Sequence, residues 1–389
     1  MPSELRVDKI STTASPYDPV FSTTGEALSH RNMIINGAMQ VYQRGSLSIT
    51  QSNNGGFALD RFRFLQNAAM GQWVGTMSQD ALNDADIATT GHTKALKVLT
   101  TTVENAVGAD ENSRVIYKIE GQDCQRLLYG TSAARSATLS FWAKSTVAAV
   151  YAVNIYQVDG DDTITKTYTL AANTWTKVSI TIPGNTLENI ANDNTVGLWI
   201  NFMLIAGGDY TSADGTSWGA WNNTKFAYGH TASSISNPWG TNASDAWYIT
   251  GVQFELGTVA TPFEHRIYQD ELRRCQRYYY KIISGADGAS SDYNDLYQNY
   301  LNIIWHNSNF GRGLITHPVT MRVNPSFSAS GNFQTIPGTD VSSSDLTAGD
   351  YGGTPIYSVR VATSGTTYQG TTIRSKNDAT AYIAFDAEL

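Results

Sequence analysis

Apolar and polar residues alternate in a series of short segments along the chain, and a period of two residues is typical of β-strands. Turns rich in Gly, Asp and Asn separate the segments. The pattern predicts strands over 32–45, 57–65, 92–103, 113–121, 136–146, 148–158, 163–170, 174–184, 194–207 and 246–257. No long amphipathic helix is predicted between them, and only 122–130 suggests a short helical turn. Strands without crossover helices pair antiparallel, so we expect a mainly β protein built on an antiparallel β-sandwich of the jelly-roll type.

The last part of the chain repeats the strand pattern on a smaller scale. Alternation predicts further strands over 300–309, 320–331, 355–365 and 380–389. Long segments rich in Gly, Ser and Asp separate these strands and are expected to be loops. We therefore expect a second, smaller β-domain, with the end of the chain held in a sheet.

Two segments depart from the strand pattern. Residues 1–31 are rich in Ser and Thr, contain three prolines and show no period, as in a disordered segment or an extended arm laid on a partner. Residues 268–282 show helical spacing instead, with acidic residues in the first turn and basic residues later, as the helix dipole favours. The apolar positions follow one another at spacings of 3, 4 and 3: Leu272, Cys275, Tyr279 and Ile282.

A single short helix is marginal in water, so this apolar face must pack against something. We predict that these four side chains lie at a subunit interface. The expected organisation is an extended attachment arm over 1–31, a jelly roll over 32–265, a connecting helix over 266–282 and a β tip domain over 283–389.

Composition and charge limit the function classes. The net charge is −8 and only 15% of the residues are charged, which argues against nucleic acid as a partner because such binders need basic surface. The chain has two cysteines, Cys124 and Cys275, too far apart for a metal motif, and free thiols are favoured over one long-range bridge. No signal peptide opens the sequence, and no apolar run of 18 residues predicts insertion into a membrane.

Several motifs in order resemble a domain of bacteriophage tail and fibre proteins. They begin with NMIINGAMQVYQRG (32–45) and ALDRF (58–62). Three later segments are similar to the matching strands of that domain, and also to strands of carbohydrate-binding-module jelly rolls. They are LSFWAKS (139–145), WTKVSITIPG (175–184) and YITGVQFELGTVATPFEHR (248–266). ELRRCQRYYYKI (271–282) resembles the junction that closes the domain, and MRVNPSFSASG (321–331) resembles a strand of the C-terminal tip domains.

The resemblance covers roughly residues 32–282 and implies a virion protein, usually homotrimeric, with no known catalytic set. On this interpretation residues 1–31 attach to a phage tail or capsid protein, and the distal end binds a host cell-surface polysaccharide. The protein would be made in the host cytoplasm and incorporated into the virion as a tail fibre or spike. Alternatives are a head fibre or capsid decoration protein, a polysaccharide depolymerase, and a bacterial carbohydrate-binding module from a secreted enzyme.

Two loop regions contain aromatic residues among Gly, Asn and Ser, a composition that suits sugar binding because flat rings stack on sugar rings. Alternatively, these aromatic side chains pack at the ends of the sandwich or between subunits. The candidate glycan-binding residues are Tyr210, Trp218, Trp221, Tyr228 and Trp239 in the first region, and Tyr293 and Tyr297 in the second.

Catalysis and metal binding have weaker signals. Three carboxylates cluster in VDGDD: Asp159, Asp161 and Asp162. A hairpin turn is the favoured interpretation of this cluster, over the paired carboxylates of a glycosidase. A structural Ca²⁺ site is the main competing interpretation. The sequence contains neither an HExxH pair of histidines nor a G-x-S-x-G elbow. We therefore expect a binding protein without catalytic residues, cofactor or metal.

Overall fold

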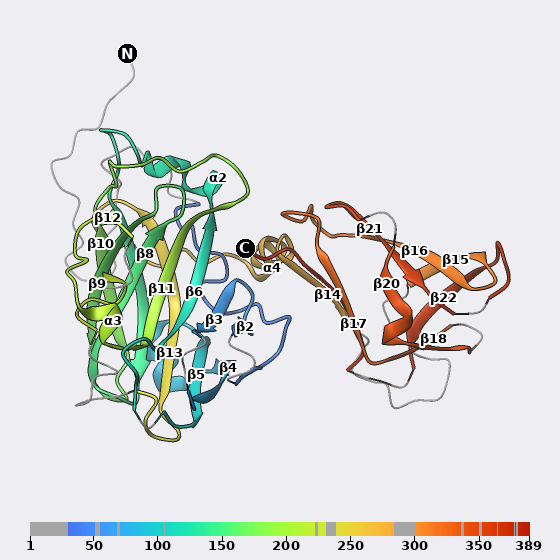
Figure 1. Ribbon diagram of the computed structural model, residues 1–389, viewed down its shortest axis with the longest axis horizontal. Coiled ribbons are helices and arrows are strands. Elements are labelled where there is room, and N and C mark those ends of the chain that lie inside the picture. The colour runs from blue at the N-terminus through green and yellow to red at the C-terminus, as the bar shows by residue number, and fades with distance from the viewer. Residues whose placement is uncertain are drawn as a thin grey trace, which may run out of the picture.

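The computed structural model describes residues 30–50, 55–67, 71–104, 106–221, 225–230, 239–283, 301–335, 338–349, 352–363, 365–376, 378 and 380–389. These residues form a larger and a smaller β-structure with one helix at their junction (Figure 1). Among them, no helix is long and apolar enough to cross a membrane. The predicted attachment arm, except for its last two residues, and the candidates Tyr293 and Tyr297 lie outside the described residues.

The larger structure is a sandwich of two antiparallel sheets, as the alternation predicted. One sheet has the order β1 (Leu47–Ile49), β4 (Val74–Ala81), β5 (Lys94–Thr102), β13 (Ala246–Leu256), β7 (Ala137–Ser145), β10 (Thr176–Ile182). The other has the order β12 (Gly219–Ala220), β9 (Asp162–Leu170), β8 (Ala149–Gln157), β11 (Val196–Ala206), β6 (Asn112–Glu120), β3 (Phe62–Gln66), β2 (Gly55–Phe57). Short helices α1 (Asp84–Thr90), α2 (Gly121–Cys124), η1 (Gln125–Leu127) and α3 (Gly208–Thr211) lie in the connections.

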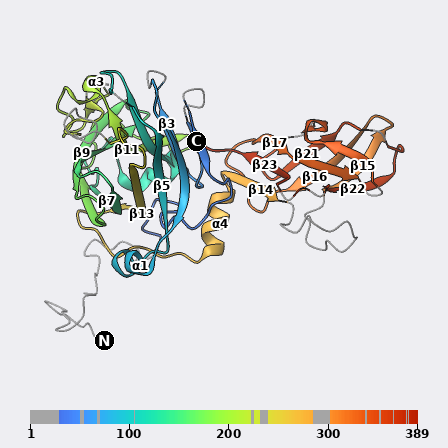
Figure 2. The ribbon, with the colours of Figure 1, turned by 90° about the horizontal axis from the view of Figure 1, so that it is seen from below.

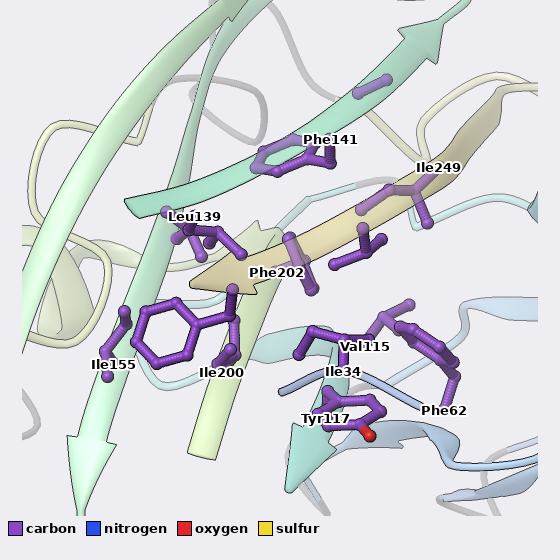
Figure 3. Close-up of a cluster of buried hydrophobic side chains, with 14 of the residues drawn as sticks. Ile34, Phe62, Val115, Tyr117, Leu139, Phe141, Ile155, Ile200, Phe202 and Ile249 are labelled. Carbon is purple, nitrogen blue, oxygen red and sulfur yellow. The ribbon is translucent and has the colours of Figure 1, made fainter. Parts of the chain in front are cut away.

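A single apolar core fills the space between the two sheets. Alternate residues of facing strands meet there, such as Phe141 of β7 with Phe202 of β11, whose ring centroids lie 5.3 Å apart (Figure 3). Figure 3 also shows Val115 and Tyr117 of β6 on this inner side. Because successive residues of a strand point to opposite faces, the residues between these core positions point away from the core.

The predicted strand over 32–45 is wrong. The segment is irregular and enters the core without pairing, with Ile34 and Met39 fully buried. Its turn is held by Asn36, which has a φ of 62° and whose amide binds both the N–H and the carbonyl oxygen of Val41, each at 2.8 Å. Asn tolerates this left-handed conformation and replaces backbone partners with its side chain, so the apolar pattern here marks burial without a ladder.

The smaller structure has its own apolar core and two antiparallel sheets. The first has the order β14 (Tyr279–Ile283), β23 (Tyr382–Asp386), β17 (Ser326–Ser330). The second has the order β19 (Asp340–Ser342), β18 (Asn332–Thr335), β22 (Gly370–Ser375), β15 (Leu301–Asn307), β16 (Phe310–Thr316), β21 (Ile356–Val361), β20 (Leu346–Ala348), with η3 (Ser343–Asp345) between β19 and β20. The last predicted strand is confirmed, because β23 pairs with both β14 and β17.

The helix at the junction is shorter than predicted. Helix α4 (Tyr268–Gln276) stops before the tyrosines, and Tyr279 begins β14, which pairs with β23 (Figures 1 and 2). The four residues predicted at a subunit interface therefore do not share one helical face. Cys275 and Tyr279 are buried within the chain, and Ile282 packs against the smaller core. Leu272 is half-buried on α4. The prediction that Cys275 and Tyr279 lie at a subunit interface is therefore wrong, because residues of their own chain already bury them.

Buried charges hold the two structures together at this junction. The carboxylate of Glu120, at the end of β6, accepts two hydrogen bonds from Arg277, at 2.9 and 2.8 Å, and one from the hydroxyl of Tyr278. Arg61 lies over the ring of Tyr278, 3.4 Å from its centroid, and pairs with Glu388 near the end of the chain. These bonds make the junction a fixed joint.

A second set of ionic contacts reinforces this joint. Arg44 binds Asp386 at 2.7 Å and lies over the ring of Tyr279, 3.6 Å from its centroid. The guanidinium of Arg322 bridges the two structures by donating to the carbonyl oxygens of Asn194 and Ala387 at 2.9 and 2.8 Å. Basic and aromatic residues around the junction therefore serve contacts inside one chain.

We predict that Glu120→Ala lowers the free energy of unfolding by about 3 kcal/mol, because removing one partner of a buried ion pair leaves the other charge uncompensated. The value is at the low end of the usual range because the Arg277 side chain is 30% exposed. Burial alone would raise the pKa of Glu120, but the hydrogen bonds from Arg277 and Tyr278 outweigh it and lower the pKa. A lowered folded-state pKa stabilises the fold above the unfolded-state value, and this contribution is lost as pH falls.

Urea unfolding monitored by tryptophan fluorescence measures the effect. Asp80→Ala is the matched control, since Asp80 forms a more exposed pair with Lys97 at 3.9 Å and should cost less than about 1 kcal/mol. Equal losses for the two variants would contradict the role assigned to Glu120.

Candidate ligand-binding site

The outward face of the seven-stranded sheet carries large and polar side chains. Trp199 of β11 lies between Tyr156 of β8 and Lys118 of β6 in the strand register. The next outward position of β11 is Asn201, whose amide donates to Asn154 Oδ1 on β8 at 3.2 Å. These positions alternate with core residues, so the sheet presents this face to the segment that follows β11.

The face is hollowed where that segment folds back over it. The hollow has a volume of about 430 Å³, within the range of roughly 300–1,000 Å³ typical of small-molecule sites. Strand and hairpin residues form its floor, and Tyr210, Trp221 and Phe226 supply its wall. The lining residues are Leu65, Asn67, Asn112, Arg114, Tyr156, Asp161, Trp199, Tyr210, Trp221 and Phe226.

Aromatic rings dominate one end of the hollow. Tyr156 lies edge-on to both Trp199 and Trp221, with centroid distances of 5.6 and 6.1 Å. The hydroxyl of Tyr156 donates to Asp161 Oδ1 at 2.7 Å, which fixes the ring. Burial, together with the Asp161 carboxylate, raises the pKa of Tyr156 to about 12, so the hydroxyl stays protonated at neutral pH.

The wall is tied to the sheet by backbone and side-chain bonds. The N–H of Trp221 donates to the carbonyl oxygen of Asp161 at 2.6 Å, next to the short pairing of β12 with β9. The hydroxyl of Tyr210 donates to the carbonyl oxygen of Asp110 at 2.9 Å and accepts from Asn67 at 3.2 Å. Phe226 is buried beneath Tyr210 and Trp221. These contacts fix the position of the wall against the sheet.

Positive charge lies at the other end of the hollow. Arg114 of β6 lies over the ring of Phe226, 4.9 Å from its centroid, and donates to Asn112 Oδ1. Burial, followed by the neighbouring charge of Arg63, lowers the pKa of Arg114 to about 10. Lys118 is not part of this end and does not line the hollow, because it lies over Trp199; burial and the charge of Arg63 lower its pKa to about 8. Both cations are destabilised by their surroundings but remain charged at neutral pH.

Three buried polar atoms on this face have no hydrogen-bond partner among the residues that the structure describes. They are Trp199 Nε1, Asn201 Oδ1 and Arg114 Nε. Buried polar groups are normally paired, and unpaired ones require an explanation such as a binding role. Two of these atoms, Trp199 Nε1 and Arg114 Nε, belong to residues that line the hollow, and rings for stacking together with unused donors give it the character of a polar-ligand site.

Of the predicted glycan-binding residues that the structure describes, Tyr210 and Trp221 line the hollow. Trp218 instead packs on Tyr129, and its Nε1 donates to the carbonyl oxygen of Pro183 at 2.7 Å. Tyr228 is half-buried and does not line the hollow.

The assignment of Trp239 as a sugar-binding residue is wrong. Its side chain is 0% exposed and packs in the core beside Trp73, with a centroid distance of 5.9 Å. A large apolar ring in the connection before β13 contributes more by filling the core than by remaining exposed in a loop, and core packing is the alternative already considered for these rings.

Sequence reasoning missed Trp199, Tyr156 and Arg114, which lie within strands. A signal was present, because Leu198 and Ile200 occupy core positions and leave Trp199 on the outward side with Asn201. An aromatic ring and an amide in the outward register of a central strand indicate a covered polar face. The loop composition alone could not show it.

The acidic cluster forms a hairpin turn between β8 and β9, as favoured from the sequence. Its three carboxylates act separately: Asp159 accepts from the N–H of Ala191 at 2.9 Å, and Asp162 accepts from Asn185 at 2.9 Å. Asp161 binds Tyr156, as described above. Within the described part of the chain, no group of three His, Cys, Asp or Glu residues is placed to hold a metal ion.

A second hollow, of about 250 Å³, lies beside His92, Phe263 and His265. These rings pack against one another edge-on or tilted, with the centroids of His92 and Phe263 4.8 Å apart and their planes at 90°. Arg266 and Glu264 in its lining bind backbone groups of the irregular segment at Asn32. The polar groups of this second hollow are therefore used in contacts that stabilise the fold. The hollow on the sheet face is the stronger candidate for a ligand-binding site.

No family model and no curated protein matches the chain. Solved structures with a similar arrangement include a CBM4 module, 11% identical over 57% of this chain and 98% of that chain, with a TM-score of 0.26. TmCBM61 in complex with β-1,4-galactotriose is 10% identical over 59% of this chain and 99% of that chain, with a TM-score of 0.28. The CBM22-1 xylan-binding domain of Paenibacillus barcinonensis Xyn10C is 10% identical over 59% and 96%, with a TM-score of 0.25.

All three are carbohydrate-binding modules, but scores this low do not decide what this chain binds. The β-sandwich assignment follows from the strand pairing, and the ligand class has to follow from the chain's own residues.

We predict that Trp239→Ala and Trp221→Ala affect stability very differently. Trp239→Ala should cost about 3–5 kcal/mol of unfolding free energy because it leaves a cavity in the core. Trp221→Ala should cost about 1 kcal/mol, since its half-buried ring forms the wall of the hollow. Chemical unfolding of both variants tests this, and a similar loss in the two would contradict the separation of core from site.

Proposed function

We propose that the chain is a non-catalytic adhesion subunit of a phage tail fibre or spike, which binds host-surface polysaccharide in the hollow of the seven-stranded sheet. The observation that carries the binding proposal is the arrangement of Tyr156, Trp199 and Trp221 around a space lined by amides and a guanidinium. Such rings offer flat apolar faces, and the polar groups fix orientation, as in small-molecule sites generally. The phage assignment is supported by the ordered sequence motifs described above.

The lining chemistry supports binding without hydrolysis. Most glycosidases use two carboxyl groups that flank the scissile bond. Among the residues that line the hollow, Asp161 is the only carboxylate, and it is engaged by Tyr156. A polysaccharide depolymerase would therefore need a second acid from outside this set.

A fibre would multiply weak sites by assembling three chains, which raises avidity without new contacts to the ligand. The smaller structure carries exposed apolar side chains that would serve this assembly. Ile304 of β15, Leu314 of β16 and Ile356 of β21 are 62%, 67% and 46% exposed. All three lie on the outward side of neighbouring strands, according to the strand register. We propose that a second and a third copy of the chain cover this face.

Leu314→Asp should convert a trimer into monomers, because a charge in an apolar interface is strongly unfavourable. Light scattering coupled to size exclusion should give three times the chain mass of 42.4 kDa for the parent protein and one chain mass for the variant. Leu187→Asp is the matched control, since Leu187 is 55% exposed on the larger structure and should leave the trimer intact. A parent protein of one chain mass would overturn the trimer.

Trp199→Ala should weaken polysaccharide binding by roughly tenfold or more, because buried aromatic anchors dominate the energy of binding sites. Affinity electrophoresis against xylan, galactan, polygalacturonate, alginate and chondroitin sulfate measures the effect. Tyr368→Ala is the control, since Tyr368 is 84% exposed on the smaller structure, away from the hollow.

Absence of binding to every polysaccharide would count against the binding proposal. Release of reducing ends during incubation would replace pure adhesion with depolymerisation.

A further inference from the structure

The positive end of the hollow contains an arginine without a counter-ion. Arg114 forms no ion pair within the described part of the chain, and its one hydrogen bond there goes from Nη1 to the neutral amide oxygen of Asn112. Its Nε is buried and unpaired. A buried cation normally has a carboxylate partner, because desolvation of an uncompensated charge is costly. Phe226 holds the guanidinium against its ring, so the group is oriented as well as unpaired.

A second arginine stands beside the first. Arg63 of β3 lies opposite Ile116 of β6, diagonal to Arg114 on the same outward face. Arg63 is half-exposed and makes neither an ion pair nor a hydrogen bond with any described residue. Two guanidinium groups placed side by side repel each other, so an anion between them would relieve both.

The arginines at the joint between the two structures are arranged differently. The sequence has 34 acidic and 26 basic residues, so carboxylates are in excess. The arginines of the joint use them: Arg61 pairs with Glu388, and Arg277 pairs with Glu120. Arg114, which lines the hollow, and its neighbour Arg63 have no such carboxylate partner among the described residues.

The opposite end of the hollow differs in charge. Asp161 lies there with Tyr156 and would repel an anion. Lys118, on the same side as Arg63, already donates to the main-chain oxygen of Leu389 at 2.9 Å and lies over Trp199. An anionic group is therefore expected at Arg114, and an uncharged part of the ligand at the aromatic end, where Lys118 and Asp161 already have partners.

We infer that the polysaccharide bound by this hollow is acidic, with a carboxylate or sulfate group that binds Arg114 and Arg63 while its sugar ring packs against Trp199. This inference rests on the proposed function, in which the hollow is a polysaccharide site. The guanidinium fork matches the two oxygens of a carboxylate or sulfate, and such charge-assisted bonds are stronger than bonds to neutral hydroxyls. The unused Nε and Nη2 of Arg114 are the donors available for them.

Isothermal titration of the full chain with polygalacturonate, alginate and chondroitin sulfate, and with neutral xylan and galactan, tests the inference. At least one acidic polymer should bind roughly tenfold or more tightly than the neutral ones, and salt should weaken it. Arg114→Gln should lose roughly tenfold or more of that affinity, and Arg114→Lys should lose less because the charge remains. Binding to polygalacturonate alone indicates a carboxylate ligand, and binding to chondroitin sulfate alone, with Arg114→Gln weakening it, indicates sulfate recognition.

Two controls keep the outcomes distinct. Arg273→Gln removes an exposed arginine of helix α4, which does not line the hollow, and should not change the affinity. Arg63→Gln gives the same readout from a half-exposed residue if Arg114→Gln does not fold. Neutral polymers bound as tightly as acidic ones, or unchanged acidic affinity in both arginine variants, would overturn the inference and leave the proposed function standing. Binding to no polymer would overturn both.

Discussion

The two-residue alternation along β6 is the constraint on which the core, the hollow and the joint all depend. Val115, Tyr117 and Ile119 point into the sandwich, and the residues between them point outward. Those outward positions supply Arg114 to the hollow and Glu120 to the joint with the smaller structure. A slip of one residue would exchange the two faces, so packing of the core fixes where both charges stand.

The contrast between these two charges explains how the chain uses its few ionisable groups. Glu120 is buried but satisfied by Arg277 and Tyr278, so it fixes the orientation of the smaller structure. Arg114 is held by a ring and a neutral amide, so its charge remains available. Removal from water favours the close pairing of Glu120 with Arg277, but it destabilises the guanidinium of Arg114, which has no such partner. An anionic ligand in the hollow would compensate this charge.

Much of the fold was predictable because strands are encoded locally by alternation, but two segments were not. Residues 32–45 carry apolar residues in strand-like order, yet the amide of Asn36 replaces the ladder partners and turns the chain. Helix α4 ends before Tyr278 because the following residues form β14, which pairs with β23, a strand more than 100 residues later in the sequence. Sequence spacing cannot reveal a partner so distant, so the apolar stripe that suggested a subunit interface is explained by contacts within the chain.

The site was only half predictable for a related reason. The loop composition pointed to Tyr210 and Trp221, whose setting among Gly, Asn and Ser is visible locally. Trp199 lies in a nearly continuous apolar run, where a ring facing outward looks like one facing inward unless the register is known. Register comes from pairing with β6 and β8, and it is this pairing that places Trp199 beside Tyr156. A central strand whose outward face carries Trp and Asn must be covered by something polar, and here the covering segment leaves room for a ligand between itself and the sheet.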